Sequence, residues 1–121
     1  MAKRVRWIEH KGKKIIYNDF SKINTNDVIT VVHQFEQMIM ANKDKEEILV
    51  LSNMTGAHVF GESYEEIKRI TKVVRPYIKK RAVVGIVGVK AILYKAVNMF
   101  AKGTPTKMFN TVEEAKNYLV E

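Results

Sequence analysis

The sequence of 121 residues contains no cysteine, two prolines and one tryptophan. The lack of cysteine excludes a disulfide framework and thiolate chemistry, which fits a reducing compartment. No apolar run approaches the ~18–20 residues that a membrane-spanning helix requires. The basic N-terminal segment also lacks the apolar stretch of a signal peptide, so we expect a cytoplasmic protein.

Catalytic and metal-binding motifs are missing as well. The three histidines, His10, His33 and His58, have neither an HxxxH spacing nor cysteine partners, so no metal site is expected. The glycine-rich phosphate-binding patterns GxxxxGK[ST] and GxGxxG do not occur. A nucleophile, a base and a group that orients them cannot be assigned. The sequence therefore predicts a protein that is not an enzyme, with no catalytic residue and no cofactor.

The composition is that of one folded domain spanning residues 1–121, with 46% hydrophobic and 28% charged residues. Lysine and arginine outnumber aspartate and glutamate by 21 to 13, which gives a net charge of +8. Such an excess favours encounters with nucleic acid, an anionic membrane surface or an acidic protein. It says nothing about the fold.

The most strongly patterned stretch runs from Arg81 to Lys102. Its first part, residues 82–87, is an unbroken apolar run rich in β-branched residues, as in a parallel strand that is covered on both faces. Apolar residues three and four positions apart then predict a helix over residues 89–101. Gly88 separates the two, and we predict a tight strand-to-helix turn there.

Four further strands and three further helices are predicted from the same kinds of pattern. The strands cover residues 5–9, 14–18, 48–51 and 106–109, and the helices cover 28–41, a segment from Ser63 and a segment from Thr111. The first two strands form a hairpin, and the last is a short edge strand. Pro76 should bend its helix or end it near Arg75, because its ring clashes with the preceding turn. The order β-β-α-β-α-β-α-β-α predicts an α/β fold with a mixed five-stranded sheet and about four helices.

Several segments carry a family resemblance. The segments are ILVLSNMTG at the third strand, RPYIKKRAVVGIVG around the fourth, and KMFNTVEEAKNYL at the end. With the element order, they resemble the STAS-domain superfamily, in particular the SpoIIAA-like (STAS/SEC14) branch of small prokaryotic proteins. The resemblance covers the chain from roughly Lys14 onward. It implies a non-catalytic regulatory or protein-interaction module, and the lipid-carrier side of the fold makes an anion- or lipid-binding protein the alternative.

Ser63 has two interpretations. With Glu66 three residues later it matches a capping box, which makes it the N-cap of a helix. The resemblance to anti-anti-sigma factors instead implies a phosphoacceptor at this junction, where those proteins carry an Asp-Ser-Ser-Gly-like motif. Here the preceding aspartate and the following glycine of that motif are absent. The capping interpretation accounts for the residue without phosphorylation.

Two candidate binding surfaces follow from the predicted fold. Ligands of open α/β sheets gather beyond the carboxyl ends of the strands. This rim would carry Ser52, Asn53, Thr55, His58, Gly88 and Lys90. A second surface is a basic stripe along one helix face, made of Lys68, Lys72, Arg75 and Lys79 and extended by Arg69, Lys80 and Arg81. The stripe is either a solvated face or a contact face for an anionic partner.

We expect a protein partner or a second copy of the chain to bind this protein. An anionic lipid or membrane surface is the alternative partner. Nucleic acid is less favoured, because the basic residues are not interleaved with aromatic ones and no recognised nucleic-acid module is visible.

Overall fold

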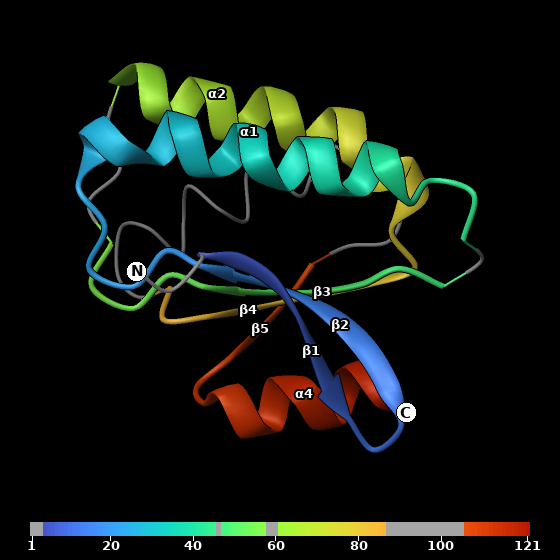
Figure 1. Cartoon of the computed structure of the whole chain (residues 1–121). Helices are drawn as coiled ribbons and strands as arrows, with labels where there is room; N and C mark the ends of the chain where they lie inside the picture. Colours follow the sequence, from blue (N-terminus) through green and yellow to red (C-terminus); the bar gives the residue numbers. More distant parts are fainter. Residues whose placement is uncertain (1–3, 46, 58–60, 87–105) are drawn as a thin grey trace.

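The computed structural model describes residues 4–45, 47–57, 61–86 and 106–121. These residues form a five-stranded sheet with the strand order β1-β2-β3-β4-β5. Helices α1 and α2 lie side by side over one face of the sheet, and α4 covers the other face (Figure 1). The strands are β1 (Val5–His10), β2 (Lys13–Asp19), β3 (Leu49–Asn53), β4 (Lys80–Val84) and β5 (Lys107–Phe109); the helices are α1 (Thr25–Ala41), α2 (Gly61–Val74), the 3₁₀ turn η1 (Arg75–Tyr77) and α4 (Val112–Val120).

The mixed sheet predicted from the sequence is confirmed. Strands β1 and β2 are antiparallel, whereas β2, β3, β4 and β5 are parallel to their neighbours. The hairpin turn consists of Lys11 and Gly12, with φ angles of 50° and 81°. Positive φ at both central residues belongs to a two-residue type I′ turn, whose twist matches that of the flanking strands. This turn fixes the register of the hairpin.

The fourth strand lies earlier than predicted. Strand β4 spans Lys80–Val84, not residues 82–87, and Gly85 follows it with a φ of 86°. A Cβ on Gly85 would lie 2.5 Å from the backbone nitrogen of Thr55, so only glycine fits this close approach. The predicted turn at Gly88 and the predicted helix over residues 89–101 lie outside the described residues.

The effect predicted for Pro76 is confirmed. Helix α2 ends at Val74, and a 3₁₀ turn over Arg75–Tyr77 carries the proline at its start. Proline fits the first turn of such a segment because its missing N–H has no intrahelical partner there.

The last helix begins after a capping residue. Thr111 precedes α4, and its hydroxyl oxygen accepts a hydrogen bond of 3.2 Å from the backbone N–H of Glu114. The Thr111 hydroxyl also contacts the Glu114 carboxylate, Oγ1 to Oε1, at 3.0 Å. These bonds fix the point at which α4 begins and hence the face that it presents to the sheet.

Two hydrophobic cores lie on opposite faces of the sheet. Side chains of a strand alternate between its faces, so Val83 joins the core under α1 and α2, while Ala82 and Val84 join the core under α4. Arg81 has the same parity as Val83. Its side chain is therefore directed into the layer between the sheet and the helix pair, where a charged group is not expected.

Candidate functional site

A pocket lies between the sheet and the α1–α2 pair. The space along it, about 380 Å³, includes open solvent, and its enclosed part is small. Its described lining is largely apolar, with three polar side chains. The lining residues are Phe20, Val32, Phe35, Met54, Ile67, Ile70 and Val83, together with Ser52, Thr71 and Arg81. An apolar cavity with a few converging polar groups is the usual form of a small-ligand site.

Arg81 is the charged group in this pocket. Its side chain belongs to a residue that is only 8% exposed. The Nε and Nη1 atoms are buried and have no hydrogen-bond partner among the described residues. The guanidinium carbon lies 5.4 Å from the centroid of the Phe35 ring. A cation–π contact of this kind contributes about 0.5–2 kcal/mol, whereas burying an ion costs several kcal/mol. The cation–π contact alone therefore leaves much of the burial cost of Arg81 uncompensated.

A buried polar pair lies on the same face of the sheet. The side-chain amide of Asn18 donates a hydrogen bond of 3.2 Å to the hydroxyl of Ser52. Both residues are buried, and the Asn18 carbonyl oxygen Oδ1 has no hydrogen-bond partner within the described part of the chain. Ser52 also lines the pocket. Polar hydrogen-bonding capacity thus lies beside the cation of Arg81 in an otherwise apolar layer.

The rim predicted at the carboxyl ends of the strands is only partly described. Ser52 faces the pocket, but Asn53 faces the opposite side of the sheet, where its amide donates to the Tyr17 hydroxyl at 3.0 Å. The backbone N–H of Thr55 donates to the side chain of Asn53 at 3.1 Å. Asn53 and Thr55 thus stabilise the turn after β3. The three remaining rim candidates, His58, Gly88 and Lys90, lie outside the described residues.

The capping interpretation of Ser63 is wrong. Helix α2 begins at Gly61, so Ser63 lies inside its first turn, and the residue is 5% exposed. Its hydroxyl donates to the backbone carbonyl of Thr25 at 2.7 Å and lies 3.0 Å from the Thr25 hydroxyl. The serine therefore ties α2 to the start of α1. Phosphorylation at this position would require the two helix ends to separate.

The basic stripe is not continuous. Arg75 is 4% exposed, because α2 ends at Val74 and the tighter 3₁₀ turn rotates Arg75 off the helix face. Lys68 lies 3.3 Å from the Glu65 carboxylate, and Lys79 pairs with Glu47. Lys72 is exposed. Arg81, predicted to extend the stripe, lines the pocket on the other side of this layer.

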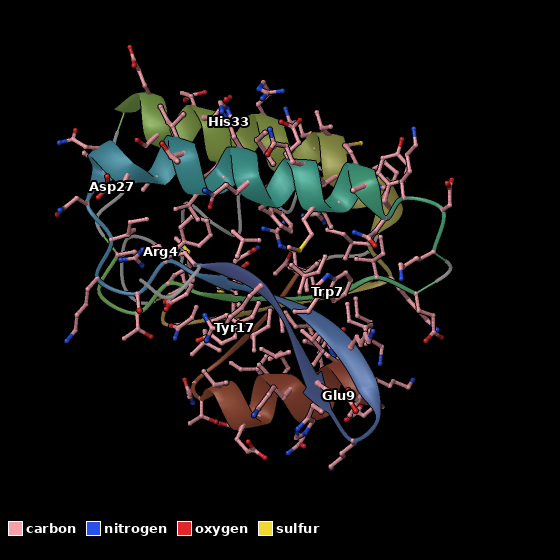
Figure 2. The ribbon with its side chains drawn as sticks, viewed as in Figure 1. Arg4, Trp7, Glu9, Tyr17, Asp27 and His33 are labelled. Atoms are coloured by element: carbon pink, nitrogen blue, oxygen red, sulfur yellow. The ribbon has the colours of Figure 1, made fainter. Side chains whose placement is uncertain are left out.

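A polar cluster between α1 and α2 was not predicted. The Glu66 carboxylate bonds Arg69 at 2.7 Å and contacts His33 across the helix pair, and Arg69 also lies 3.6 Å from Glu36. His33 lies at the helix pair, away from the sheet (Figure 2). The hydrogen bond from Arg69 and then that from His33 lower the pKa of Glu66 to about 2. Glu66 was instead assigned to the capping box with Ser63. The sequence did contain a signal for this pair, because Glu66 and Arg69 are three residues apart and oppositely charged residues at this spacing can pair on a helix.

Sequence reasoning also missed the burial of Arg81. The signal was present in the alternation of β4, where Arg81 and Val83 share one parity. It could be used only with the correct start of the strand at Lys80. A strand that begins at residue 82 leaves Arg81 in a loop, and an arginine in a loop is expected to be solvated.

Within the described ranges, no helix is long and apolar enough to cross a membrane. The same ranges contain no group of three or more histidine or acidic side chains that could hold a metal ion.

The comparisons with known proteins define the fold. A crystal structure of an uncharacterised protein of the DUF3478 family from Shewanella loihica PV-4, described as having a SpoIIAA-like fold, matches with a TM-score of 0.70. The match covers 95% of this chain and 91% of that chain at 14% sequence identity. No protein-family model matches the sequence, and no curated protein matches it. The chain therefore has a SpoIIAA-like fold, which confirms the fold that the resemblance implied; at this identity the likeness extends to the fold alone.

Proposed function

We propose that this protein is a non-catalytic regulatory module of the STAS type that acts by binding protein, and that it associates with a second copy through strand β1. The observation that carries the proposal is Trp7, a 38% exposed tryptophan on an edge strand. Buried tryptophan side chains dominate the binding energy of many protein interfaces. Strand β1 runs along the near border of the sheet, with Trp7 and Glu9 on it (Figure 2).

The backbone of β1 can accept another strand. Among the described residues β1 pairs only with β2. The Arg4 carbonyl accepts a hydrogen bond of 2.7 Å from the Asp19 N–H, so residues of the same parity as Arg4 face β2. In an antiparallel pair, successive residues direct their backbone N–H and C=O groups alternately toward and away from the neighbouring strand. The N–H and C=O groups of Val5, Trp7 and Glu9 consequently point away from β2. This open row of donors and acceptors is a template for strand addition.

A two-fold arrangement suits this edge. Opposite residues of antiparallel strands share a face, so a two-fold axis at Trp7 would place the Trp7 side chains of both copies opposite each other. Val5 of each copy would then lie opposite Glu9 of the other. An aromatic pair of this kind contributes about 0.5–1.5 kcal/mol beyond its burial. In this register no like charges lie opposite each other between residues 5 and 9.

The test is the oligomeric state of the Trp7→Ser variant. Val73 is the matched control, because it is also 38% exposed but lies on α2. In sedimentation velocity over a range of concentrations, wild type and Val73→Ser should form a dimer, and Trp7→Ser should remain a monomer. A wild type that stays monomeric throughout, or a Trp7→Ser dimer as tight as wild type, would overturn the proposal.

Peripheral attachment to an anionic membrane through the basic stripe has less support. Arg75 is buried, and two of the remaining lysines, Lys68 and Lys79, already have carboxylate partners. Attachment of this kind requires several uncompensated charges, each worth about 1 kcal/mol near an anionic surface.

A further inference from the structure

We propose that mild acid separates the two copies joined through β1, because protonation of His10 sets a positive charge opposite Arg4 of the second copy. This regulation rests on the dimer proposed above, in which Trp7 lies on the two-fold axis. Three features of β1 support it: the register that the axis imposes, the lasting charge of Arg4, and a contact that lets His10 gain a proton.

The axis at Trp7 fixes which residues meet beyond the central pair. In an antiparallel pair of identical strands centred on residue 7, residue 4 of one copy lies opposite residue 10 of the other. The backbone carbonyl of Arg4 is directed toward β2, and His10 has the same parity. Arg4 and His10 therefore form a non-hydrogen-bonded pair of the new contact, the kind whose Cα atoms are only about 4.5 Å apart. The two-fold axis produces this pair twice in each dimer.

Both side chains belong to the α4 face of the sheet. Arg4, directly before β1, and His10 share parity with Ile8, which packs against the core under α4. His10 contacts Asn117 of α4, with Nε2 and Oδ1 2.9 Å apart. Opposite residues of antiparallel strands share a face, so the imidazole of one copy meets the guanidinium of the other on this side of the sheet.

Arg4 keeps its charge in this position. Its guanidinium donates to the backbone carbonyls of Asp19 and Ser21, at 2.9 Å and 3.2 Å, and no carboxylate pairs with it among the described residues. The Asp19 carboxylate instead accepts a hydrogen bond of 3.0 Å from the backbone N–H of Ser21. Arginine stays protonated at any physiological pH. The charge opposite His10 is therefore constant, and only the histidine responds to pH.

His10 can gain a proton without losing its contact with α4. A side-chain amide oxygen only accepts, so the imidazole donates from Nε2 to Oδ1 of Asn117. The neutral and the protonated ring can both donate in this way, with Nδ1 as the nitrogen that takes up the proton. Protonation therefore adds charge to this face of the strand without removing the bond.

The other charged groups around His10 are the same in the monomer and in the dimer. Its neighbours on the hairpin are Lys13, directly across on β2, and Lys11 in the turn. The acidic residues of the α4 segment, none of which forms an ion pair with His10 among the described residues, are Glu113, Glu114 and Glu121. Arg4 of the second copy is the charge that association adds. The dimer thus binds protons less readily than two monomers do, and linkage makes it weaker as the pH falls.

The experiment measures the dimer dissociation constant of the full-length chain by sedimentation velocity at about pH 8 and about pH 6, at low salt. Carboxylates stay ionised over this range, whereas histidine changes its charge. The dissociation constant of wild type should be about tenfold higher at pH 6, because two like-charge pairs form in each dimer. A dimer equally tight at both pH values would overturn the switch and leave the β1 contact standing. A chain that stays monomeric at pH 8 would overturn both.

The variant His10→Gln tests the titrating group, since glutamine keeps an amide donor for Asn117 and takes up no proton. Its dissociation constant should differ less than about twofold between the two pH values. His33→Gln is the matched control, because it removes a histidine that contacts Glu66 on the α2 side of α1, and it should keep the tenfold change. A His10→Gln dimer that weakens in acid as much as wild type would contradict the switch.

The variant Arg4→Glu tests the other half of the pair and does not depend on how glutamine fits at residue 10. A carboxylate opposite the protonated His10 attracts it, so the dimer should become tighter from pH 8 to pH 6. If Arg4 only holds the carbonyls of Asp19 and Ser21, its loss changes the dimer by the same factor at both pH values. An Arg4→Glu dimer that still weakens in acid would overturn the proposal.

Discussion

Ser63 shows how one hydroxyl can serve either a helix end or a contact between two helices. A capping serine lies before the first turn and accepts a hydrogen bond from the backbone of its own helix. Ser63 instead lies inside the first turn of α2 and donates to the carbonyl of Thr25. The spacing from Ser63 to Glu66 is the same in both cases. Only the position of the helix start, at Gly61, distinguishes them.

Replacement of Ser63 distinguishes the two roles by experiment. Ser63→Ala removes the bonds to Thr25 and should lower the free energy of unfolding by about 1 kcal/mol. Ser63→Asp should be more destabilising than Ser63→Ala, because it buries a charge between two helices. A capping role predicts the reverse order, since aspartate caps as well as serine. Urea unfolding of the three proteins at neutral pH measures the order, and an aspartate variant as stable as wild type would contradict the contact role.

At the scale of elements, a charged cluster joins α1 and α2 at the surface of their contact. The Glu66 carboxylate pairs with Arg69 of its own helix and with His33 of α1. Its side chain is only 20% exposed. The ionised carboxylate is therefore the form that the folded protein favours. Its pKa of about 2, compared with an ordinary value of 4.5, expresses this preference.

The stability contributed by Glu66 should depend on pH. A carboxyl group with a depressed pKa stabilises the fold above its unfolded pKa, and this stability is lost as pH falls toward the folded pKa. The difference in the free energy of unfolding between wild type and Glu66→Gln should therefore be present at neutral pH and shrink as the pH falls from about 4.5 to about 2. Glu65→Gln is the control, because Glu65 is 67% exposed and pairs only with Lys68 among the described residues. A Glu66→Gln difference that does not change over this range would contradict the account.

The elements that could be predicted from sequence are those with strong local signals. The hairpin, helix α1, strand β3 and the capped start of α4 follow from periodicity, glycine and capping residues, and the structure has all of them. The faces of Arg75 and Arg81 were misassigned because each depends on a boundary. The 3₁₀ turn changes the direction in which the Arg75 side chain leaves the backbone. A strand that starts two residues earlier than predicted places Arg81 within β4 and not in a loop. The pocket itself is a relation between α1, α2 and the sheet, and no local pattern encodes it.

At the scale of the whole molecule, charge is unevenly compensated. The chain has a net charge of +8, and some of its carboxylates are shared between two cations. Glu47 pairs with Lys79 and lies 3.9 Å from Lys13, so it links the ends of β2 and β4 across β3. The hydrogen bond from Lys79 lowers the pKa of Glu47, and the charge of Lys13 adds to this effect. The remaining cations repel one another over distances longer than those of the ion pairs.

Added salt should therefore stabilise this protein. Raising NaCl from about 0.01 M to about 0.1 M shortens the Debye length from about 30 Å to about 10 Å, which screens the long-range repulsion more than contacts between paired side chains. The midpoint of thermal unfolding should rise over this range.

Glu47→Gln removes one negative charge and one shared partner, so its midpoint should be lower than that of wild type, and the difference should be largest at low salt. Asp44→Asn removes the same charge from an exposed loop residue and separates the effect of net charge from that of the local pair. A wild-type midpoint that falls as salt is added would show that the ion pairs outweigh the repulsion, because screening would then remove more attraction than repulsion.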